Sequence, residues 1–363
     1  MKKARRFLTI ALLVFNAMAI LLLWVCCAST WLSPERFPKL ALLGLLFPAF
    51  VLANLFCTIP WLFVRWRWAW IPLAGTLPCM SFLMDYFPIS FGGEPPAGSL
   101  KVITWNAAGY GYQSANRDSA LTVFRNYIEN CDADIICFQE AQTRCIHTED
   151  FYATMERKGY YCHEEMGKAV FSRLPIIAHE NITYRSHALE GQSVVNGSIA
   201  YRILFQGDTL LLINNHLESN HLNPEEKDEY VRGLDEHNIN ELKSSGKTVL
   251  SKVSQRTAIR AQQADSLANY IQHHDHMPII MCGDFNDTPI SYVYQRINKL
   301  LDNAYRKSGN GMGISYNKKG FWVRIDHVFM SHHWKSFKTH IDTTHDISDH
   351  YPLVTWLHYE REN

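Results

Sequence analysis

The first 97 residues of this 363-residue chain contain few acidic side chains and no histidine. Only three of the 35 Asp and Glu residues lie there, against eight of the 35 Lys and Arg residues, and all 17 histidines follow. The remainder carries 27 basic and 32 acidic residues. The formal neutrality of the whole chain therefore combines a basic, almost wholly apolar part with a mildly acidic part of mixed composition.

The nine cysteines include no pair with C-x-x-C spacing, which argues against a zinc site with cysteine ligands. Cys137 and Cys282 fall inside expected core strands, where a free cysteine is usually a small buried apolar residue. Cys131, Cys145 and Cys162 remain as candidates for one disulfide. Cysteine content alone does not define the compartment.

Three long apolar segments, 7–28, 40–64 and 68–87, dominate the first part of the chain. The first two reach the roughly 20 residues that a helix needs to span a bilayer. The third is just long enough and is interrupted by Pro72 and Pro78. Residues 1–90 are therefore predicted to form a membrane anchor with about three transmembrane helices.

Basic residues flank these segments asymmetrically. Four lie within residues 2–6, and Arg65 and Arg67 separate the second segment from the third. The positive-inside rule then places both groups in the cytoplasm, and three spans export the rest of the chain. This predicts a multi-pass protein of the bacterial inner (plasma) membrane with an extracytoplasmic domain. Two alternatives stay open: the first segment is a signal peptide, or the third lies along the interface and leaves the domain cytoplasmic.

A Gly/Pro-rich linker, 91–99, precedes a domain over residues 100–363 that is long enough for one large core. No internal repeat or low-complexity tract is visible. Short apolar strands alternate with helical segments, which is typical of an α/β domain with mixed sheets. Strands are expected at 100–105, 134–138, 167–177, 201–205, 209–214, 279–282, 321–330 and 351–358, and helices at 121–130 and about 247–274.

Polar residues recur at the ends of these strands. The clearest stretch is 277–291, MPIIMCGDFNDTPIS, in which an apolar strand delivers two carboxylates and an amide to a turn. A strand followed by an Asx turn explains one such case, but not six in one domain. The six places are Asn106, Glu140, His216, Asp284 with Asn286, Asp326, and Asp349 with His350. Oxygen ligands and imidazoles of this kind suit a metal-bound phosphate ester.

The ordered motifs TWN, QE, NNHLE, GDFND, RIDHV and SDHYP, within residues 102–356, resemble the endonuclease/exonuclease/phosphatase superfamily of the deoxyribonuclease I type. The pair GDFND and SDHYP is the most specific part of this resemblance. It implies a four-layer α/β sandwich, with two mixed β-sheets flanked by helices. The predicted N-terminal transmembrane helices precede this domain and lie outside the resemblance. It also implies hydrolysis of a phosphoester that depends on Mg²⁺ or Mn²⁺.

The resemblance and the charges of the side chains together suggest a role for each residue. Glu140, Asn106 and Asp349 are the expected metal ligands or their supports. His350 is expected to act as a general base or to bind phosphate, with Asp326 fixing its tautomer. The remaining catalytic candidates are Asp284 and Asn286, which would orient the attacking water and a phosphate oxygen, and His216. His216 would donate to a non-bridging oxygen or stabilise the leaving oxygen.

The substrate stays open at this level: nucleic acid, a lipid headgroup or a small phosphodiester. Acidic residues outnumber basic ones by five after residue 97, which argues mildly against a nonspecific nuclease. A membrane anchor, in contrast, favours a lipid substrate, because it holds the domain close to the bilayer. Two alternatives stay open for the loop 109–112: it stacks on a base or covers a headgroup, or it is only a flexible loop. A catalytically idle binding member is the alternative from another class. No protein partner is inferable.

Overall fold

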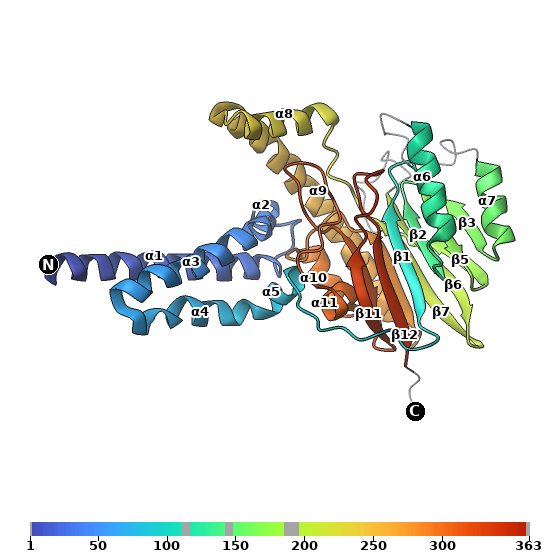
Figure 1. Ribbon diagram of the computed structural model, residues 1–363, viewed down its shortest axis with the longest axis horizontal. Helices are drawn as coiled ribbons and strands as arrows, with labels where there is room; N and C mark the ends of the chain where they lie inside the picture. Colours follow the sequence, from blue (N-terminus) through green and yellow to red (C-terminus); the bar gives the residue numbers. More distant parts are fainter. Residues whose placement is uncertain (1, 111–116, 142–147, 185–195, 361–363) are drawn as a thin grey trace.

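The computed structural model describes residues 2–110, 117–141, 148–184 and 196–360. A long helical projection carries the N-terminus, and a domain built on two β-sheets follows it (Figure 1). The projection contains α1 (Lys2–Ser29), α2 (Pro38–Ala41), α3 (Phe47–Arg65), α4 (Trp70–Thr76) and α5 (Met80–Tyr86). The chain runs inward along α1, outward along α3 and inward again along α4 and α5, toward the two-sheet domain (Figure 1).

Two helical segments of the projection, Lys3–Ser29 and Pro38–Trp68, are long and apolar enough to cross a membrane. The third apolar segment differs from the expected single helix. It forms two seven-residue helices separated by a 3-10 turn over Leu77–Cys79. Pro78 lies in that turn and has no N–H to continue the α-helical hydrogen bonds, which accounts for the interruption.

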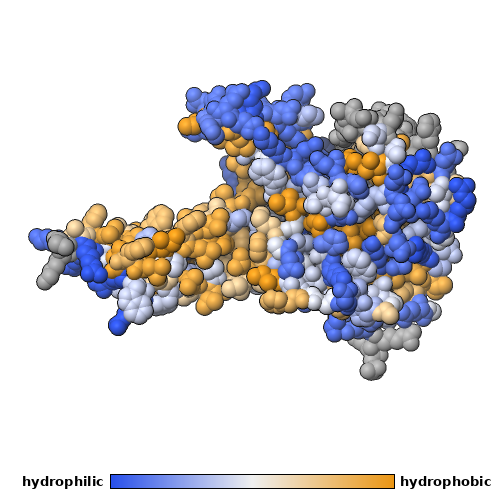
Figure 2. Space-filling model, in the orientation of Figure 1, coloured by the Kyte–Doolittle hydropathy of each residue, from blue (hydrophilic) through white to orange (hydrophobic). Residues whose placement is uncertain are grey.

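The surface of the projection is apolar, in contrast to that of the domain (Figure 2). Phe7 and Phe63 are 76% and 84% exposed, and only 28% of an apolar 18-residue window in each candidate span is buried. A core helix of a water-soluble protein would hide such a surface. These two helices are therefore candidate membrane spans.

The first sheet has the strand order β11-β12-β1-β2-β4-β3. In it, β1 and β2 pair in parallel, and the other pairs are antiparallel. Its strands are β1 (Leu100–Asn106), β2 (Ile135–Gln139), β3 (Tyr161–Glu165), β4 (Lys168–Ser172), β11 (Trp334–Ile341) and β12 (Leu353–Tyr359).

The second sheet has the order β5-β6-β7-β8-β10-β9, with β7 and β8 parallel and the remaining pairs antiparallel. Its strands are β5 (Ile176–Asn181), β6 (Gly197–Phe205), β7 (Asp208–His216), β8 (Ile279–Asp284), β9 (Asp302–Asn303) and β10 (Asp326–Met330). Both sheets are thus mixed, as predicted.

Helices cover the outer face of each sheet. The first sheet carries α6 (Arg117–Asn130) and α7 (Thr148–Arg157), and the second carries α9 (Ile239–His273) and α10 (Tyr292–Asn298). Alternation along the strands explains the layers: Val102 packs between the sheets, whereas Ile103 packs under α6. The central strands are buried on both faces and therefore appear as continuous apolar runs in the sequence. The predicted four-layer sandwich is confirmed.

The remaining helices are α8 (Pro224–Asp235), which packs against the first half of α9 and stands out from the domain, and α11 (Ala304–Ser308) (Figure 1).

Some expected elements differ from the structure. The expected strand 167–177 is two strands, β4 and β5, that belong to different sheets, and only Asp326–Met330 of 321–330 is a strand. The strands β3 and β11 were not expected. Cys131 and Cys162 are free, and Cys145 lies outside the described residues.

The projection is docked onto the domain through a buried polar contact. Asp85, 1% exposed, accepts hydrogen bonds from Arg306 at 2.6 Å and Gln295 at 2.9 Å. Its backbone carbonyl accepts a further bond from Arg324. Because these partners lie on the domain, the end of α5 and the domain form one hydrogen-bonded unit.

A close backbone approach adds to this docking. A Cβ atom at Gly44 would lie 1.9 Å from the carbonyl oxygen of Ile290, so only glycine fits there. Ile290 belongs to the segment that follows β8, and it joins the apolar cluster of the projection. The apolar helices thus pack directly on the segment that carries Asp284.

Candidate active site

The strand ends that carry the predicted site residues meet at one edge of the sandwich. Parallel pairing places Asn106 at the end of β1 beside Gln139, and His216 at the end of β7 beside Asp284. Antiparallel pairing of β10 with β8 places Asp326 opposite Asp284. The carboxyl ends of β1, β2, β7 and β8 therefore share an edge with the amino end of β10.

Asn106 links the two sheets at this edge. Its side-chain nitrogen donates to Glu140 Oε1 at 3.2 Å and to Asp284 Oδ2 at 3.0 Å. Glu140 follows β2 in the first sheet, with a φ of +50°, and Asp284 ends β8 in the second sheet. The left-handed backbone at Glu140 turns the chain sharply at the strand end, and the Glu140 carbonyl accepts a hydrogen bond from Gly109.

His350 and Asp326 form a hydrogen-bonded pair. His350 Nδ1 lies 2.8 Å from Asp326 Oδ2, and both side chains are buried. The Trp105 indole N–H donates to the His350 carbonyl at 2.9 Å and fixes the backbone there. Asp326 Oδ1 is buried without a hydrogen-bond partner in the described part of the chain. That oxygen is therefore available to a group absent from the described residues.

Asp284 lies between two imidazoles. Its Oδ2 is 3.7 Å from His350 Nε2 and 3.8 Å from His216 Nε2, and His216 Nε2 is also 3.7 Å from Glu140 Oε1. The backbone N–H of Asn286 donates to Asp284 Oδ1 at 2.8 Å. Asn286 thus orients Asp284, while its own side-chain nitrogen donates to the Leu217 carbonyl at 3.2 Å.

Burial and mutual charge shift the pKa values of these groups. Burial, together with the charge of Asp326, raises the pKa of Asp284 to about 7 against the opposing effect of His350. Burial alone would lower the pKa of His350, but Asp326 and Asp284 outweigh it and raise that pKa to about 10. Burial also raises the pKa of Glu140. His350 is therefore an imidazolium at neutral pH, and Asp284 titrates near neutrality.

Seven of the eight predicted site residues contact one another at this edge of the sandwich or orient a residue that does. Asp349 is the exception: its half-buried carboxylate is close enough to Glu140 to contribute to the raised pKa there.

The predicted role of loop 109–112 needs a correction. Tyr110 is 1% exposed and packs on Phe124 and Phe138, so it is a core residue. Residues 111 and 112 lie outside the described residues.

Two arginines of α9 also support the site, and neither was among the site residues expected from the sequence. Arg256 pairs with Glu218 Oε1 at 2.8 Å, and Arg260 donates to the Glu218 carbonyl at 2.8 Å. Arg260 also lies 3.5 Å from Asp287. Because Glu218 follows His216 and Asp287 follows Asp284, these arginines fix both segments behind the catalytic edge.

A cation from α8 reaches the site, and no sequence signal indicated it. Lys227 Nζ donates to the Tyr316 hydroxyl at 2.8 Å and lies 5.4 Å from the centre of that ring. The Tyr316 ring packs edge-on against His350, with ring centres 5.0 Å apart. Lys227 also acts electrostatically on Glu140. The protruding helix α8 therefore contributes positive charge at the edge of the site.

The donor set at this edge fits a hard divalent cation. Glu140, Asp284, Asp326 and Asp349 supply carboxylate oxygens, and Asn106 carries an amide between two of them. Mg²⁺ and Mn²⁺ prefer such oxygens. The buried, unpartnered oxygen of Asp326 is a further sign of room for a polar group. Asp284, Asp326 and His350 alone already offer ligand atoms within 4.8 Å of one another.

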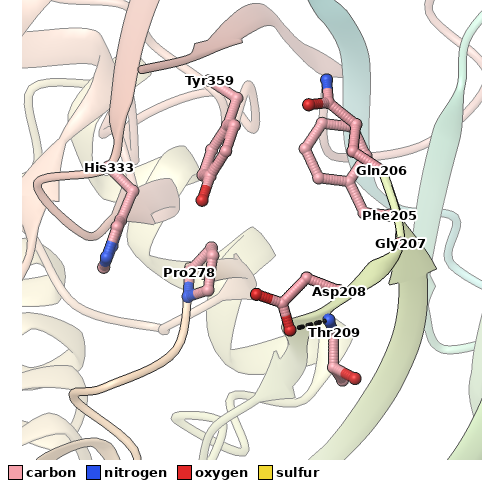
Figure 3. A pocket seen from close by; sticks show the side chains of 8 residues that line it. All are labelled: Phe205, Gln206, Gly207, Asp208, Thr209, Pro278, His333 and Tyr359. Carbon is pink, nitrogen blue, oxygen red and sulfur yellow. Dashed lines mark hydrogen bonds between the residues drawn. The ribbon is translucent and has the colours of Figure 1, made fainter. Parts of the chain in front are cut away.

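A separate cavity of about 380 Å³ lies at the far end of the second sheet, beside the β6–β7 turn (Figure 3). His333 and Tyr359 line it together with Asp208, whose carboxylate accepts a bond from the Thr209 N–H at 2.7 Å. β7 starts at this cavity and ends at His216, so the cavity is separated from the catalytic edge by the length of the strand. It is not part of the candidate active site.

The chain thus combines a two-sheet sandwich with an Asp–His pair and a carboxylate–amide cluster at one edge. The family model described as Endonuclease/Exonuclease/phosphatase family matches residues 103–350, so the chain belongs to this family. Residues 5–86 match a separate model, a domain of unknown function (DUF8431). No curated protein matches the chain.

Solved structures share the fold at low sequence identity. A family member from Bacteroides thetaiotaomicron is 17% identical over 74% of this chain and 100% of its own, with a TM-score of 0.53. ANGEL2, a 2′,3′-cyclic phosphatase, is 16% identical over 71% and 95%, with a TM-score of 0.52. The human Nocturnin catalytic domain is 17% identical over 75% and 96%, with a TM-score of 0.50. These similarities establish the fold.

Proposed function

We propose that the chain is a membrane-anchored phosphodiesterase that depends on Mg²⁺ or Mn²⁺ and uses water as the nucleophile. The observation that carries this proposal is the convergence of Asn106, Glu140, Asp284, His350 and Asp326 at one edge of the sandwich. Glu140, Asn106 and Asp349 would hold the metal ion, with the Asn106 amide rotated to present its oxygen. When bound, the ion polarises a phosphoryl oxygen and neutralises developing charge.

The protein groups divide the remaining work by their charge. Asp284, with a pKa of about 7, accepts a proton from the attacking water, and Asn286 orients it through the 2.8 Å backbone hydrogen bond. His350, held as an imidazolium by Asp326, binds a phosphate oxygen. This charge state favours phosphate binding over the general-base role for His350. His216 stabilises the leaving oxygen.

The position of the basic residues supports the proposed topology. Arg5, Arg6, Arg65 and Arg67 line one cavity of about 600 Å³ together with Trp66 and other residues, and Arg5 donates to the Val64 carbonyl at 2.9 Å. This basic end of the projection lies farthest from the two-sheet domain (Figure 1). Placing it in the cytoplasm of a bacterial inner membrane puts the catalytic domain on the extracytoplasmic side.

Protease protection tests that topology. In intact spheroplasts, added protease is expected to degrade the catalytic domain, because it faces outward. A tag before residue 2 should survive until the membrane is permeabilised. A shielded catalytic domain, with an N-terminal tag that is also shielded, would mean that the third apolar segment does not cross the membrane.

The substrate class has two candidates. A nuclease-type activity is the first, since the family includes nucleases by its name. A phospholipid-type headgroup diester is the second, and the docking of the anchor on Ile290 favours it because that contact fixes the catalytic edge relative to the bilayer. Cleavage of single-stranded DNA and release of headgroups from phospholipid vesicles, measured side by side, separate the two candidates.

The first experiment is hydrolysis of bis-p-nitrophenyl phosphate by the full chain in lipid nanodiscs, with Mg²⁺, Mn²⁺ or EDTA. The full chain is required because Asp85 and Ile290 join the anchor to the domain. Turnover should depend on metal and disappear in Glu140→Gln and His350→Ala. Glu360→Gln, at an exposed ion pair with Lys335, is the matched control. No turnover by a folded chain on this ester, DNA or vesicles would favour an inactive binding member.

A further inference from the structure

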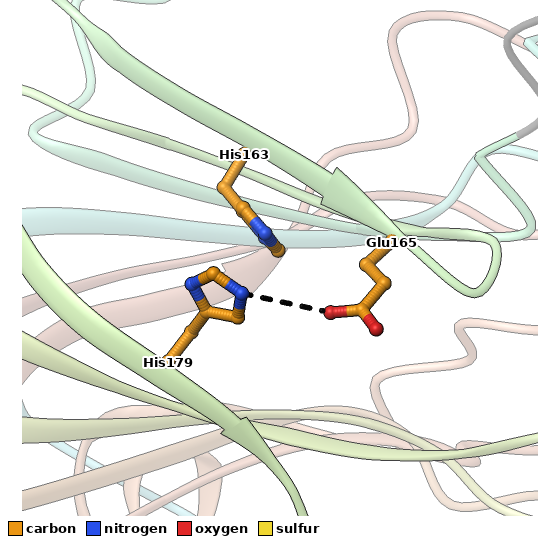
Figure 4. Close-up of side chains that lie close together, drawn as sticks. All are labelled: His163, Glu165 and His179. Atoms are coloured by element: carbon orange, nitrogen blue, oxygen red, sulfur yellow. Dashed lines mark ion pairs between the residues drawn. The ribbon is translucent and has the colours of Figure 1, made fainter.

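A second cluster of side chains that can ligate a metal ion lies outside the candidate active site. It joins an edge strand of the first sheet to an edge strand of the second. It consists of His163 and Glu165 on β3, the edge strand of the first sheet, and His179 on β5, the edge strand of the second (Figure 4). His163 and Glu165 are two residues apart on one strand and therefore share a face. The three side chains point toward one another across the gap between the sheets (Figure 4).

The distances in this cluster suit one shared ion. One ligand atom of each residue lies within 4.8 Å of the other two. His179 Nε2 is 3.8 Å from Glu165 Oε2, and the two imidazole rings have centres 3.9 Å apart. Ligand atoms at about 2.0 Å from a tetrahedral ion are roughly 3.3 Å apart, so small side-chain rotations close the site.

Neighbouring residues already orient two of the three ligands. His163 Nδ1 lies 3.3 Å from the Tyr201 hydroxyl, and donation from Nδ1–H to that oxygen leaves Nε2 free for an ion. Asn181 donates to Glu165 Oε1 at 2.8 Å, which leaves Oε2 facing His179. Second hydrogen bonds of this kind are typical of the supports around metal ligands.

An ion pair explains this cluster only in part. A protonated His179 would pair with Glu165, but that pair involves only two of the three side chains. Burial and the neighbouring His179 lower the pKa of His163. Two neutral imidazoles and a carboxylate match the ligand set that tetrahedral Zn²⁺ accepts, with water as the fourth ligand.

We propose that His163, Glu165 and His179 form a zinc site that ties the edge of one sheet to the edge of the other. No strand pairing joins β3 to β5, so the ion would add a direct link between the sheets. The site also has a path to the catalytic edge. Gly167, in the turn after Glu165, accepts a hydrogen bond from the N–H of Ala141, the residue after Glu140. Zinc binding would thus stabilise the turn behind Glu140.

Calorimetric titration of Zn²⁺ into the full chain in nanodiscs tests this proposal, with millimolar Mg²⁺ present to occupy the catalytic oxygens. We expect His179→Ala to bind one zinc ion fewer per chain than the wild type. Asn181→Ala should keep that ion with about 10–100-fold weaker affinity, because it only orients Glu165. His340→Ala is the matched control, an exposed histidine on the edge strand β11 at the other side of the first sheet.

Thermal unfolding gives a readout that is independent of stoichiometry. Saturating Zn²⁺ should raise the unfolding temperature of the wild type by roughly 5 °C or more at a hundredfold excess over the dissociation constant. The same rise should occur in His340→Ala and be lost in His179→Ala and Glu165→Gln. Equal zinc stoichiometry, affinity and thermal shift in the wild type and His179→Ala would overturn the proposal. Neither readout depends on phosphodiester hydrolysis.

Discussion

Asp85 and Arg306 form an ion pair of 2.6 Å that joins the last helix of the apolar projection to the catalytic domain. The Asp85 carboxylate is 1% exposed on a side-chain basis, whereas Arg306 is 29% exposed. Arg324, which donates to the Asp85 carbonyl, lies two residues before Asp326 in the chain. The projection is therefore linked through a short path to the Asp–His pair of the site.

Replacing Asp85 by Ala should destabilise the full chain by about 1.5–3 kcal/mol, because it removes the buried acceptor of the Arg306 and Gln295 hydrogen bonds, while Arg306 itself keeps partial contact with water. Glu94→Ala removes an exposed partner of Lys338 and should cost less than about 1 kcal/mol. Denaturant unfolding of both variants in the same detergent measures the difference. Equal stability of the two variants would show that the docking contact contributes nothing beyond a surface pair.

Replacing Asp326 by Asn should reduce kcat by roughly 10²–10⁴-fold. The neutral amide no longer raises the pKa of His350, so His350 loses its proton at a lower pH. The alkaline limb of the pH–rate profile should therefore move to lower pH in this variant. Asp342→Asn is the control: Asp342 accepts hydrogen bonds from Tyr127 and Thr344, so its replacement should leave the profile unchanged. An unshifted alkaline limb in Asp326→Asn contradicts the proposed imidazolium.

Replacing Lys227 by Ala should lower kcat/KM by roughly tenfold, mainly through a higher KM, since its charge is positioned to bind substrate phosphate. Lys227→Arg keeps the charge and should retain most of the activity. Lys319→Ala removes an exposed partner of Asp235 on the same helix α8 and serves as the control. Steady-state kinetics on bis-p-nitrophenyl phosphate give both constants. An unchanged KM in Lys227→Ala would assign Lys227 a structural role only.

Because of His327, we expect the free energy of unfolding to fall as the pH drops from about 6.5 to 3. Burial and the nearby Arg324 lower its pKa in the folded chain to about 3, while the unfolded chain keeps the ordinary value. Within this window the unfolded state binds the extra proton, so stability decreases with acidity. His327→Gln keeps a donor for the Asp287 carbonyl and should show a shallower loss. Denaturant unfolding at pH 7 and pH 5 measures this loss of stability. The control, His340→Gln, is expected to lose as much stability as the wild type.

Local pattern in the sequence determined much of this fold. The run Ile279–Cys282 and the segment after Leu100 are apolar on both faces because helices cover one side of each sheet and the other sheet covers the second. Their polar ends, Asn106 and Asp284, were visible in the sequence because each interrupts an apolar run, although both side chains are buried in the structure. The motif order then indicated the family without any spatial information.

The hydrogen bonds between distant residues were decided by the tertiary structure alone. Asn106 contacts Glu140 because β1 and β2 are neighbours in one sheet, and it contacts Asp284, 178 positions further along the chain, because β8 lies in the facing sheet. The break between β4 and β5 and the meeting of His163 with His179 depend on the packing of one sheet on the other, and the contact of Lys227 with Tyr316 depends on the packing of α8 against α9. Sequence periodicity reports which face of an element is buried, but not which distant element covers it.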